Sequence, residues 1–133
     1  LVLSSSKKLA AITNNGQSRQ SITLIDTQTE TVLDDQPIAK SWVGLAFSRD
    51  EKKLYASGGN DNTVVIYNIE NQKLRRDTVI RLGQPWPKRI SPAGLCLDET
   101  RNRLYVVAKD DSTLYACDLT SLQIVQKTKL PTE

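Results

Sequence analysis

The sequence contains no histidine and no methionine, and its 133 residues include only two cysteines and one phenylalanine. Without histidine, a zinc site of the Cys/His type and a His-based catalytic triad are both excluded. Cys96 and Cys117 are too few for a disulfide scaffold, and they lack the close spacing of a metal or redox motif. We therefore expect two free thiols, and we assign no catalytic residue, no metal and no cofactor to this chain.

Long apolar runs and charge of one sign are also missing. No run approaches the ~20 apolar residues that span a bilayer, and no charged start precedes an apolar signal segment. The 18 Lys and Arg residues barely exceed the 15 Asp and Glu residues, and they are scattered. We therefore expect no membrane span and no nucleic-acid partner. The chain begins with Leu1 and lacks Met, which leads us to expect a segment of a longer or processed chain.

The chain contains three similar segments with a period of ~45–50 residues. Each segment starts with a short apolar run, continues through a polar turn into a second run, and has a third run that ends in Asp or Asn. These terminal residues are Asp26, Asn68 and Asp118. In the same superposition, the second runs are aligned on three leucines, namely Leu9, Leu54 and Leu104. An insertion around Gln84-Pro-Trp-Pro-Lys-Arg lengthens the second segment.

Each segment contains four runs that are typical of strands, because they are rich in Val, Ile, Leu and Tyr and bounded by turn residues. The run Val64-Val65-Ile66-Tyr67 is apolar on both faces, so both faces must be covered. No segment shows a sustained helical period, and no helix is predicted. A four-stranded repeat of this length predicts the blades of a β-propeller. A sandwich does not require a repeat of this period, and a twelve-stranded barrel would need strict alternation.

We predict an all-β fragment of three four-stranded antiparallel blades. The blades are expected at residues 1–42, at 43–92 with an inter-blade insertion at 83–92, and at 93–133. The strands nearest the axis are predicted at Leu1–Ser4, Leu45–Ser48 and Leu95–Asp98. Propellers usually close with four to eight blades, roughly 180 residues or more at this period. We therefore expect a larger ring of seven blades, completed by further blades of the same chain or by other copies.

An open ring leaves two sheet faces uncovered. We expect the strands Leu9–Ile12 and Ile22–Ile25 to be half exposed on one side. On the other side we expect exposure of Val106, Val107, Leu114 and Tyr115. Exposed apolar patches above a few hundred Å² are uncommon on stable monomers, so the 133-residue chain is expected to associate through these faces.

The repeat resembles the YVTN-type bacterial β-propeller repeats. Leu104-Tyr-Val-Val-Ala-Lys stands where that family carries its name motif, and Leu54-Tyr-Ala-Ser-Gly-Gly is a second copy. Ile22-Thr-Leu-Ile-Asp-Thr and Leu114-Tyr-Ala-Cys-Asp-Leu match the third strand of the family. The resemblance implies a bacterial propeller of the periplasm or cell envelope. Similar propellers are amino-terminal parts of longer proteins, some of which continue into a phosphoesterase-like domain.

One turn departs from the family pattern. The Asp-Gly turn between the first two strands is replaced by Ser5-Ser6-Lys7, Asp50-Glu51-Lys52 and Thr100-Arg101-Asn102. Because the glycine is missing in all three blades, we expect these loops to be longer than a two-residue hairpin.

Candidate binding residues lie in the turns between second and third strands and in the connections between blades. In propellers these segments meet at one mouth of the channel, and a Trp beside a cation can stack on a sugar, base or peptide group. The candidates are Asn14, Arg19, Lys40, Trp42, Asn60, Asp61, Trp86, Arg89, Lys109 and Asp110. Two simpler interpretations stay open. Each Trp can plug the gap between neighbouring blades, and the Asn and Asp residues can be ordinary turn residues.

The sequence predicts a non-catalytic binding or scaffold module that takes a protein or a small polar ligand at these loops. The alternative is part of an enzyme, either a lactonase-like propeller or the accessory propeller of a phosphoesterase. We can assign no converging set of metal ligands from three blades, and Asp110-Asp111 supplies too few oxygens for Ca²⁺. Gly58-Gly59 is not a phosphate loop, and no Gly-x-Ser-x-Gly elbow occurs in the sequence.

Overall fold

The computed structural model describes residues 1–132 and consists of strands that form three four-stranded antiparallel sheets. Sheet 1 contains β1 (Val2–Leu3), β2 (Leu9–Asn15), β3 (Gln20–Asp26) and β4 (Thr31–Pro37). Sheet 2 contains β5 (Leu45–Phe47), β6 (Lys53–Ser57), β7 (Thr63–Glu70) and β8 (Lys73–Arg81). Sheet 3 contains β9 (Pro92–Asp98), β10 (Arg103–Ala108), β11 (Thr113–Asp118) and β12 (Ile124–Lys129). In each sheet the strands follow the order of the sequence, which confirms the predicted blade arrangement.

One short 3₁₀ helix, η1 (Gly59–Asp61), occurs where only a turn was predicted. Within residues 1–132, no helix is long and apolar enough to cross a membrane.

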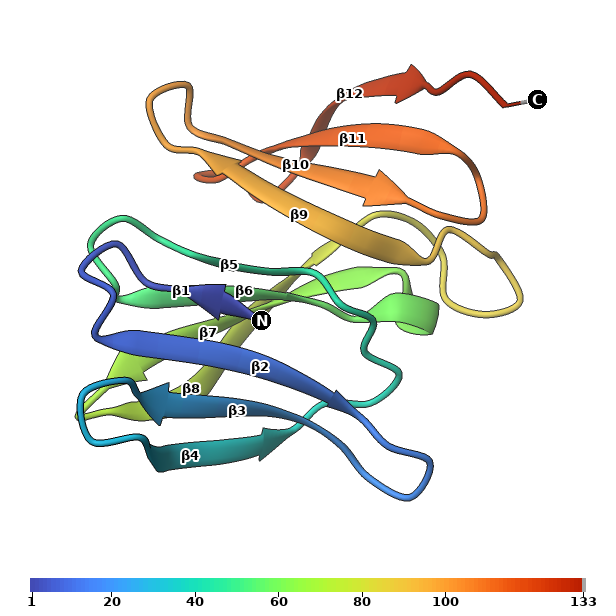
Figure 1. The fold of residues 1–133 in the computed structure, drawn as a ribbon. Coiled ribbons are helices and arrows are strands. Elements are labelled where there is room, and N and C mark those ends of the chain that lie inside the picture. Colours follow the sequence, from blue (N-terminus) through green and yellow to red (C-terminus); the bar gives the residue numbers. More distant parts are fainter. Residues whose placement is uncertain (133) are drawn as a thin grey trace.

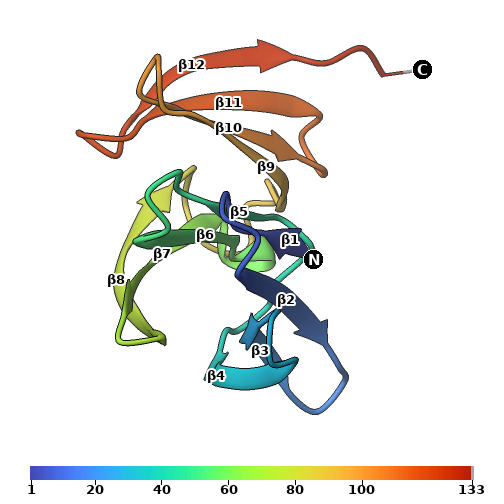
Figure 2. The ribbon, with the colours of Figure 1, turned by 60° about the vertical axis from the view of Figure 1, so that its left-hand side comes forward.

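The three sheets fan out from a shared centre, and the first strand of each sheet lies nearest to it (Figures 1 and 2). At the centre, β5 and β9 pass so closely that Gly44 has no room for a side chain. A Cβ at Gly44 would lie 1.9 Å from the carbonyl oxygen of Ala93. The inner position predicted for the first strands is therefore confirmed.

All three sheets interrupt their pairing at the same point of the repeat. The register between the third and fourth strands shifts at Leu24/Ile25, at Ile66/Tyr67 and at Ala116/Cys117. Each shift lies directly before the Asp or Asn that marks the end of the third run. A bulge conserved across the three units shows that they are copies of one structural element.

The superposition on three leucines is wrong by one residue in sheet 1. Asp26 pairs with Leu9, whereas Asn68 pairs with Lys53 and Asp118 pairs with Arg103. Ala10, not Leu9, therefore corresponds to Leu54 and Leu104. Because Leu9-Ala-Ala-Ile is apolar on both faces, the pattern alone does not fix its register.

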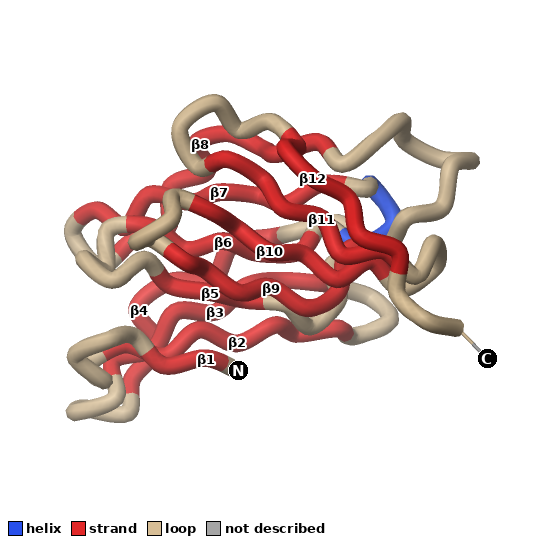
Figure 3. The backbone as a smooth tube through the Cα atoms, turned by 90° about the horizontal axis from the view of Figure 1, so that it is seen from above, coloured by secondary structure: helices blue, strands red, loops and turns tan. Residues whose placement is uncertain are grey.

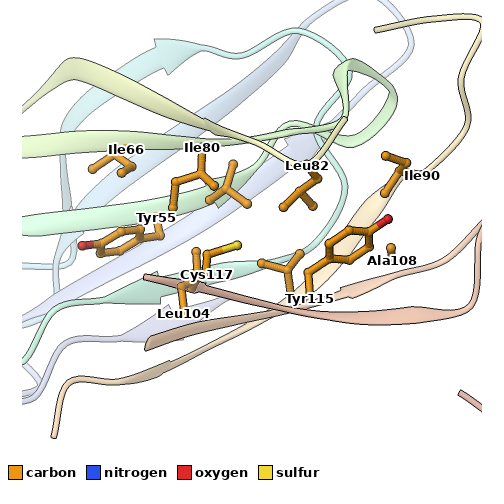
Figure 4. Packing of buried hydrophobic residues seen from close by; sticks show 11 residues of the cluster. Tyr55, Ile66, Ile80, Leu82, Ile90, Leu104, Ala108, Tyr115 and Cys117 are labelled. Carbon is orange, nitrogen blue, oxygen red and sulfur yellow. The ribbon is translucent and has the colours of Figure 1, made fainter. Parts of the chain in front are cut away.

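Two apolar clusters hold the sheets together. Ala11, Ile22 and Leu24 of sheet 1 pack against Leu54, Ala56, Val65 and Tyr67 of sheet 2. The second cluster lies between sheets 2 and 3, where Tyr55, Ile66 and Ile80 meet Leu104, Val106, Tyr115 and Cys117 (Figure 4). Successive residues of β6 point to opposite faces, so this one strand contributes to both clusters. Each fully buried side chain of this size contributes about 1.5–3 kcal/mol.

The outer face of sheet 3 differs from the prediction. Val106 and Tyr115 are buried against sheet 2, because they share a face with Leu104 and Cys117. Val107, which is 42% exposed, and Leu114 lie on the outer face. Adjacent residues of a strand cannot share a face, and the prediction overlooked this alternation.

The turns between first and second strands are longer than two residues, as predicted. Each contains a non-glycine residue with positive φ, namely Lys7, Glu51 and Asn102. Carboxylates connect neighbouring turns across the sheets. Glu51 accepts the backbone N–H of Ser6 at 2.5 Å, and Glu99 accepts that of Arg49 at 3.0 Å. The sheets are therefore joined at this end by charge-assisted hydrogen bonds as well as by the core.

Candidate functional site

The insertion at 83–92, η1 and the turn between β10 and β11 gather at one end of the sheets, to the right in Figure 1. Figure 3 shows η1 in blue beside the loops of this end. We call this end the loop face. Most of the candidate binding residues that were predicted from the sequence lie at this end.

The insertion is anchored at both of its ends. Leu82 and Ile90 are each 2% exposed and belong to the apolar cluster between sheets 2 and 3. On the far side, the backbone N–H groups of Lys109 and Asp110 donate to the carbonyl oxygens of Ser91 and Ile90 at 3.0 and 3.1 Å. The insertion and the β10–β11 turn are thus joined.

Asn62 fixes the shape of the insertion from within. Its buried amide donates to the carbonyl oxygens of Gln84 and Lys88 at 2.8 and 2.6 Å. Its side-chain oxygen accepts the N–H groups of Ile90 and Ser91, each at 3.1 Å. All four hydrogen-bonding positions of the amide are therefore used, and each bonded group belongs to the insertion.

The backbone before Asn62 is equally constrained. Asn62 has a φ of 56°, a left-handed conformation that Asn tolerates better than most residues. Gly59 has a φ of 50°, and a Cβ there would lie 1.9 Å from the carbonyl oxygen of Lys40 and 2.3 Å from Cδ1 of Trp42. Only glycine fits at this position, because both the backbone angle and the contact forbid a side chain.

A hollow of about 300 Å³ lies between the insertion and the β10–β11 turn. Five predicted residues line it, namely Asn60, Trp86, Arg89, Lys109 and Asp110. The structure adds Asn62, Lys88 and Ser91 to this lining. Trp86 is 61% exposed, and the guanidinium carbon of Arg89 lies 5.1 Å from the centre of its ring. Trp86 therefore does not plug a gap between sheets, and its ring is accessible at the loop face.

Trp42 has a different environment. The Nζ of Lys109 lies 4.5 Å from the centre of its ring, and its carbonyl oxygen accepts the side-chain amide of Asn15 at 3.3 Å. With Gly59 packed against it, Trp42 touches residues of all three sheets or their loops. This placement agrees with the interpretation that Trp42 fills the space between blades.

A smaller hollow, of about 240 Å³, lies beside Trp42 and is also lined by Lys40 and Asn60. Asn60 lines both hollows, so the two adjoin at this residue. Lys40 forms an ion pair with Asp61 at 3.3 Å.

Two candidates lie apart from these hollows. The amide of Asn14 donates to the hydroxyls of Ser21 and Thr23 on the outer face of sheet 1. Arg19 forms an ion pair with Asp35 at 2.7 Å on the same sheet. Neither residue lines the hollow that contains Trp86.

The adjacent carboxylates Asp110 and Asp111 bind different partners. Asp110 accepts the hydroxyl of Ser91 at 2.7 Å, and Asp111 accepts that of Tyr115 at 2.5 Å. Burial, and then the bond to Asp111, raises the pKa of Tyr115. Among residues 1–132, no group of three or more Cys, Asp or Glu side chains could hold a metal ion.

Asn62 is the main residue that the sequence did not identify. An Asn-Asp-Asn turn next to a strand is typical of many hairpins, so the buried member of the three is not distinguishable by its pattern. The one available signal was a polar residue two positions before the apolar run Val64-Val65-Ile66-Tyr67.

No protein-family model matches the chain, and no curated protein matches its sequence. Solved structures share its fold. Hydrazine synthase of Kuenenia stuttgartiensis superposes with a TM-score of 0.72 at 18% identity, over 94% of this chain and 33% of that one. The Cps50 (Swd1) β-propeller domain of Myceliophteria thermophila gives a TM-score of 0.75 at 15% identity, over 99% and 43%.

A functionally unknown protein of Desulfotomaculum acetoxidans gives a TM-score of 0.76 at 11% identity, over 98% of this chain and 42% of that one. The chain therefore spans less than half the length of these three similar structures. Identities this low bear on the fold alone. The structural similarities and the three radial sheets together define the class of protein: the chain is a fragment of a β-propeller.

Proposed function

We propose that this chain is part of a β-propeller binding module that takes a small polar ligand, or a short exposed segment of a protein, in the hollow beside Trp86. The observation that carries the proposal is Asn62, whose buried amide holds the insertion in one shape through four hydrogen bonds. An ordinary surface loop does not require such an anchor. Trp86, Lys88 and Arg89 of the insertion line the hollow. Its volume of about 300 Å³ lies at the lower end of the range for ligand sites.

The wider setting of the module is also a proposal. The resemblance of the repeats to the YVTN-type family supports a bacterial scaffold or binding propeller of the periplasm or cell envelope. The two uncovered sheet faces support a larger ring, completed by further blades of the same chain or by other copies.

The binding proposal is tested by nuclear magnetic resonance on the ¹⁵N-labelled protein. The probes are glucose, galacturonate, citrate, adenosine monophosphate and the peptide Glu-Ala-Glu. We expect at least one probe to shift the amides of residues 60–62, 86–91 and 109–110. Shifts confined to the inner strands β5 and β9, or no shift with any probe, would contradict the proposal.

Two variants locate the site. Trp86→Ala should strongly reduce the shifts at the same probe concentration, because it removes the exposed ring from the hollow. Lys127→Ala is the matched control, since its Nζ also lies over an aromatic ring, at 5.4 Å from that of Tyr115, but outside the hollow. Retention of the shifts in Trp86→Ala would place the binding elsewhere.

A further inference from the structure

The lining of the hollow beside Trp86 has an unequal charge. The lining contains three cationic side chains, those of Lys88, Arg89 and Lys109, and one carboxylate, that of Asp110. The local charge is therefore positive, although the chain as a whole carries only +3 over its 133 residues. A concave surface with an excess of one sign of charge raises the local concentration of ions of the opposite sign. The ligand should therefore carry a negative group.

A simple inorganic anion fits this lining poorly. Asp110 would repel it, and the neutral amide of Asn60 and hydroxyl of Ser91 would do little to balance its negative charge. The lining offers donors in the cations, an acceptor in Asp110, and groups that do both in Asn60 and Ser91. Asp110 binds Ser91 through Oδ2, and within residues 1–132 its Oδ1 makes no hydrogen bond. This mixture suits a ligand that has several hydroxyl groups in addition to its negative charge.

The exposed indole of Trp86 adds a third requirement. A large aromatic side chain at the rim of a polar hollow offers an apolar surface that is open at one side. A sugar ring has an apolar face of C–H groups and a polar rim of hydroxyls, and it can satisfy both surfaces at once. The lining is otherwise mostly polar, so it provides no pocket for the apolar side chain of a peptide.

We propose that this hollow binds a saccharide that carries a carboxylate, of the uronic-acid type. The sugar ring lies on Trp86, the carboxylate is bound by Arg89 and Lys109, and ring hydroxyls bind Asn60 and Asp110. This assignment rests on the proposed function, because it names the ligand class of the same site.

The test is calorimetric titration of the protein with the trisaccharides of galacturonic acid and of glucuronic acid. Methyl-esterified trigalacturonate serves as the neutral counterpart, and triglutamate serves as a peptide of similar charge. We expect at least one acidic trisaccharide to bind. The ester and the peptide should each bind at least about tenfold more weakly, since each lacks one of the two features that the lining recognises.

Variants connect the binding to the hollow. Arg89→Ala should weaken the acidic trisaccharide by about tenfold or more, which is the effect of one hydrogen bond to a charged group. Trp86→Ala should weaken it by a similar factor, and Lys127→Ala should leave it unchanged. Circular dichroism and thermal unfolding of each variant show whether the fold is retained. Equal binding by wild type, Arg89→Ala and Trp86→Ala would overturn the assignment.

The remaining outcomes separate this inference from the proposed function. If triglutamate binds as tightly as the acidic trisaccharides and depends on Arg89, the saccharide class is wrong and the site stands. If neither trisaccharide binds but a probe other than galacturonate shifts the loop-face amides, the saccharide class again fails alone. If nothing binds and no amide shifts, both proposals fail.

Discussion

Two sheet faces occupy the same position in the repeat but carry different residues. One is the face of sheet 2 that is covered by sheet 1, and the other is the uncovered outer face of sheet 1. On sheet 2 this face contains Val65, which lies two residues before Tyr67 at the bulge and is 3% exposed. The equivalent residue on sheet 1 is Thr23. Its hydroxyl accepts the amide of Asn14 at 2.6 Å and donates to Asp35 at 2.7 Å. A polar chain thus crosses the uncovered face where an apolar contact occupies the covered one.

This chain of hydrogen bonds ends on Arg19, which pairs with the second oxygen of Asp35. The hydroxyls of Ser21 and Thr23, and then the charge of Arg19, lower the pKa of Asp35. Polar groups that bind one another in this way tolerate contact with water. The outer face of sheet 3 is less polar near the β10–β11 turn, where Val107 pairs with Leu114. The stability of the fragment therefore comes from the two covered interfaces, and the two uncovered faces are not equivalent.

The largest effect should come from deleting a covered side chain. Leu104 is completely buried between sheets 2 and 3, and Leu104→Ala should lower the free energy of unfolding by about 2–5 kcal/mol through lost burial and a cavity. Val107→Ala, on the outer face of the same sheet, should cost less than about 1 kcal/mol when the protein is dilute enough to be monomeric. Urea unfolding of both variants measures the difference. Equal losses would show that the outer face is covered by something in the folded protein.

The next effect concerns association through the uncovered faces. Burying an apolar side chain contributes roughly 1.5–3 kcal/mol, so we expect the 133-residue chain to associate in solution. Val107→Asp should shift the mass measured by light scattering toward the monomer. Val43→Asp is the control, because Val43 is 63% exposed but lies outside the sheets. A wild-type chain that is already monomeric would contradict the expectation.

The two cysteines distinguish the covered face of sheet 3 from its uncovered face, and they do so without any substitution. Cys96 on β9 is exposed, whereas Cys117 on β11 is buried, and β10 lies between the two strands. Burial raises the pKa of Cys117 to about 11. With a thiol reagent near pH 8, Cys96 should react at once in the folded protein, and Cys117 should react only after unfolding. Both should be reactive in the denatured, unreduced protein, and a single fast thiol should vanish in Cys96→Ser.

The fold was predictable because the repeat appears three times. Strand order, free thiols and the inner position of the first strands all follow from one alignment of the units. The register of Leu9 was not predictable, since an apolar run on both faces fits two alignments equally well. Val106 and Tyr115 were misplaced for a simpler reason: the strand alternation was not applied to each residue.

The candidate site was predictable only in part. Loop position alone was enough to predict that Asn60, Trp86, Arg89, Lys109 and Asp110 lie at the loop face. It did not distinguish them from Asn14 and Arg19, whose side chains bind across the outer face of sheet 1. The role of Asn62 depends on the path of the insertion, which the residues of a single turn do not specify. Long-range contacts of this kind require the folded structure.

The smallest expected effect tests whether the covered interfaces are also held at their turns. Glu51 accepts the N–H of Ser6 across sheets 1 and 2, and this bond, followed by the Ser6 hydroxyl, lowers the pKa of Glu51 from 4.5 to about 2. Because the folded pKa lies below the unfolded one, the stabilisation is complete above pH 4.5 and disappears as the pH falls toward 2. Glu51→Gln should cost less than about 1 kcal/mol at pH 7, since the group is near the surface. The cost should vanish near pH 2, as urea unfolding across this range would show. Glu30→Gln, in an exposed turn, should have no effect at either pH. A cost for Glu51→Gln that persists at pH 2 would mean that the shape of the turn, and not the charge of the carboxylate, joins the two sheets.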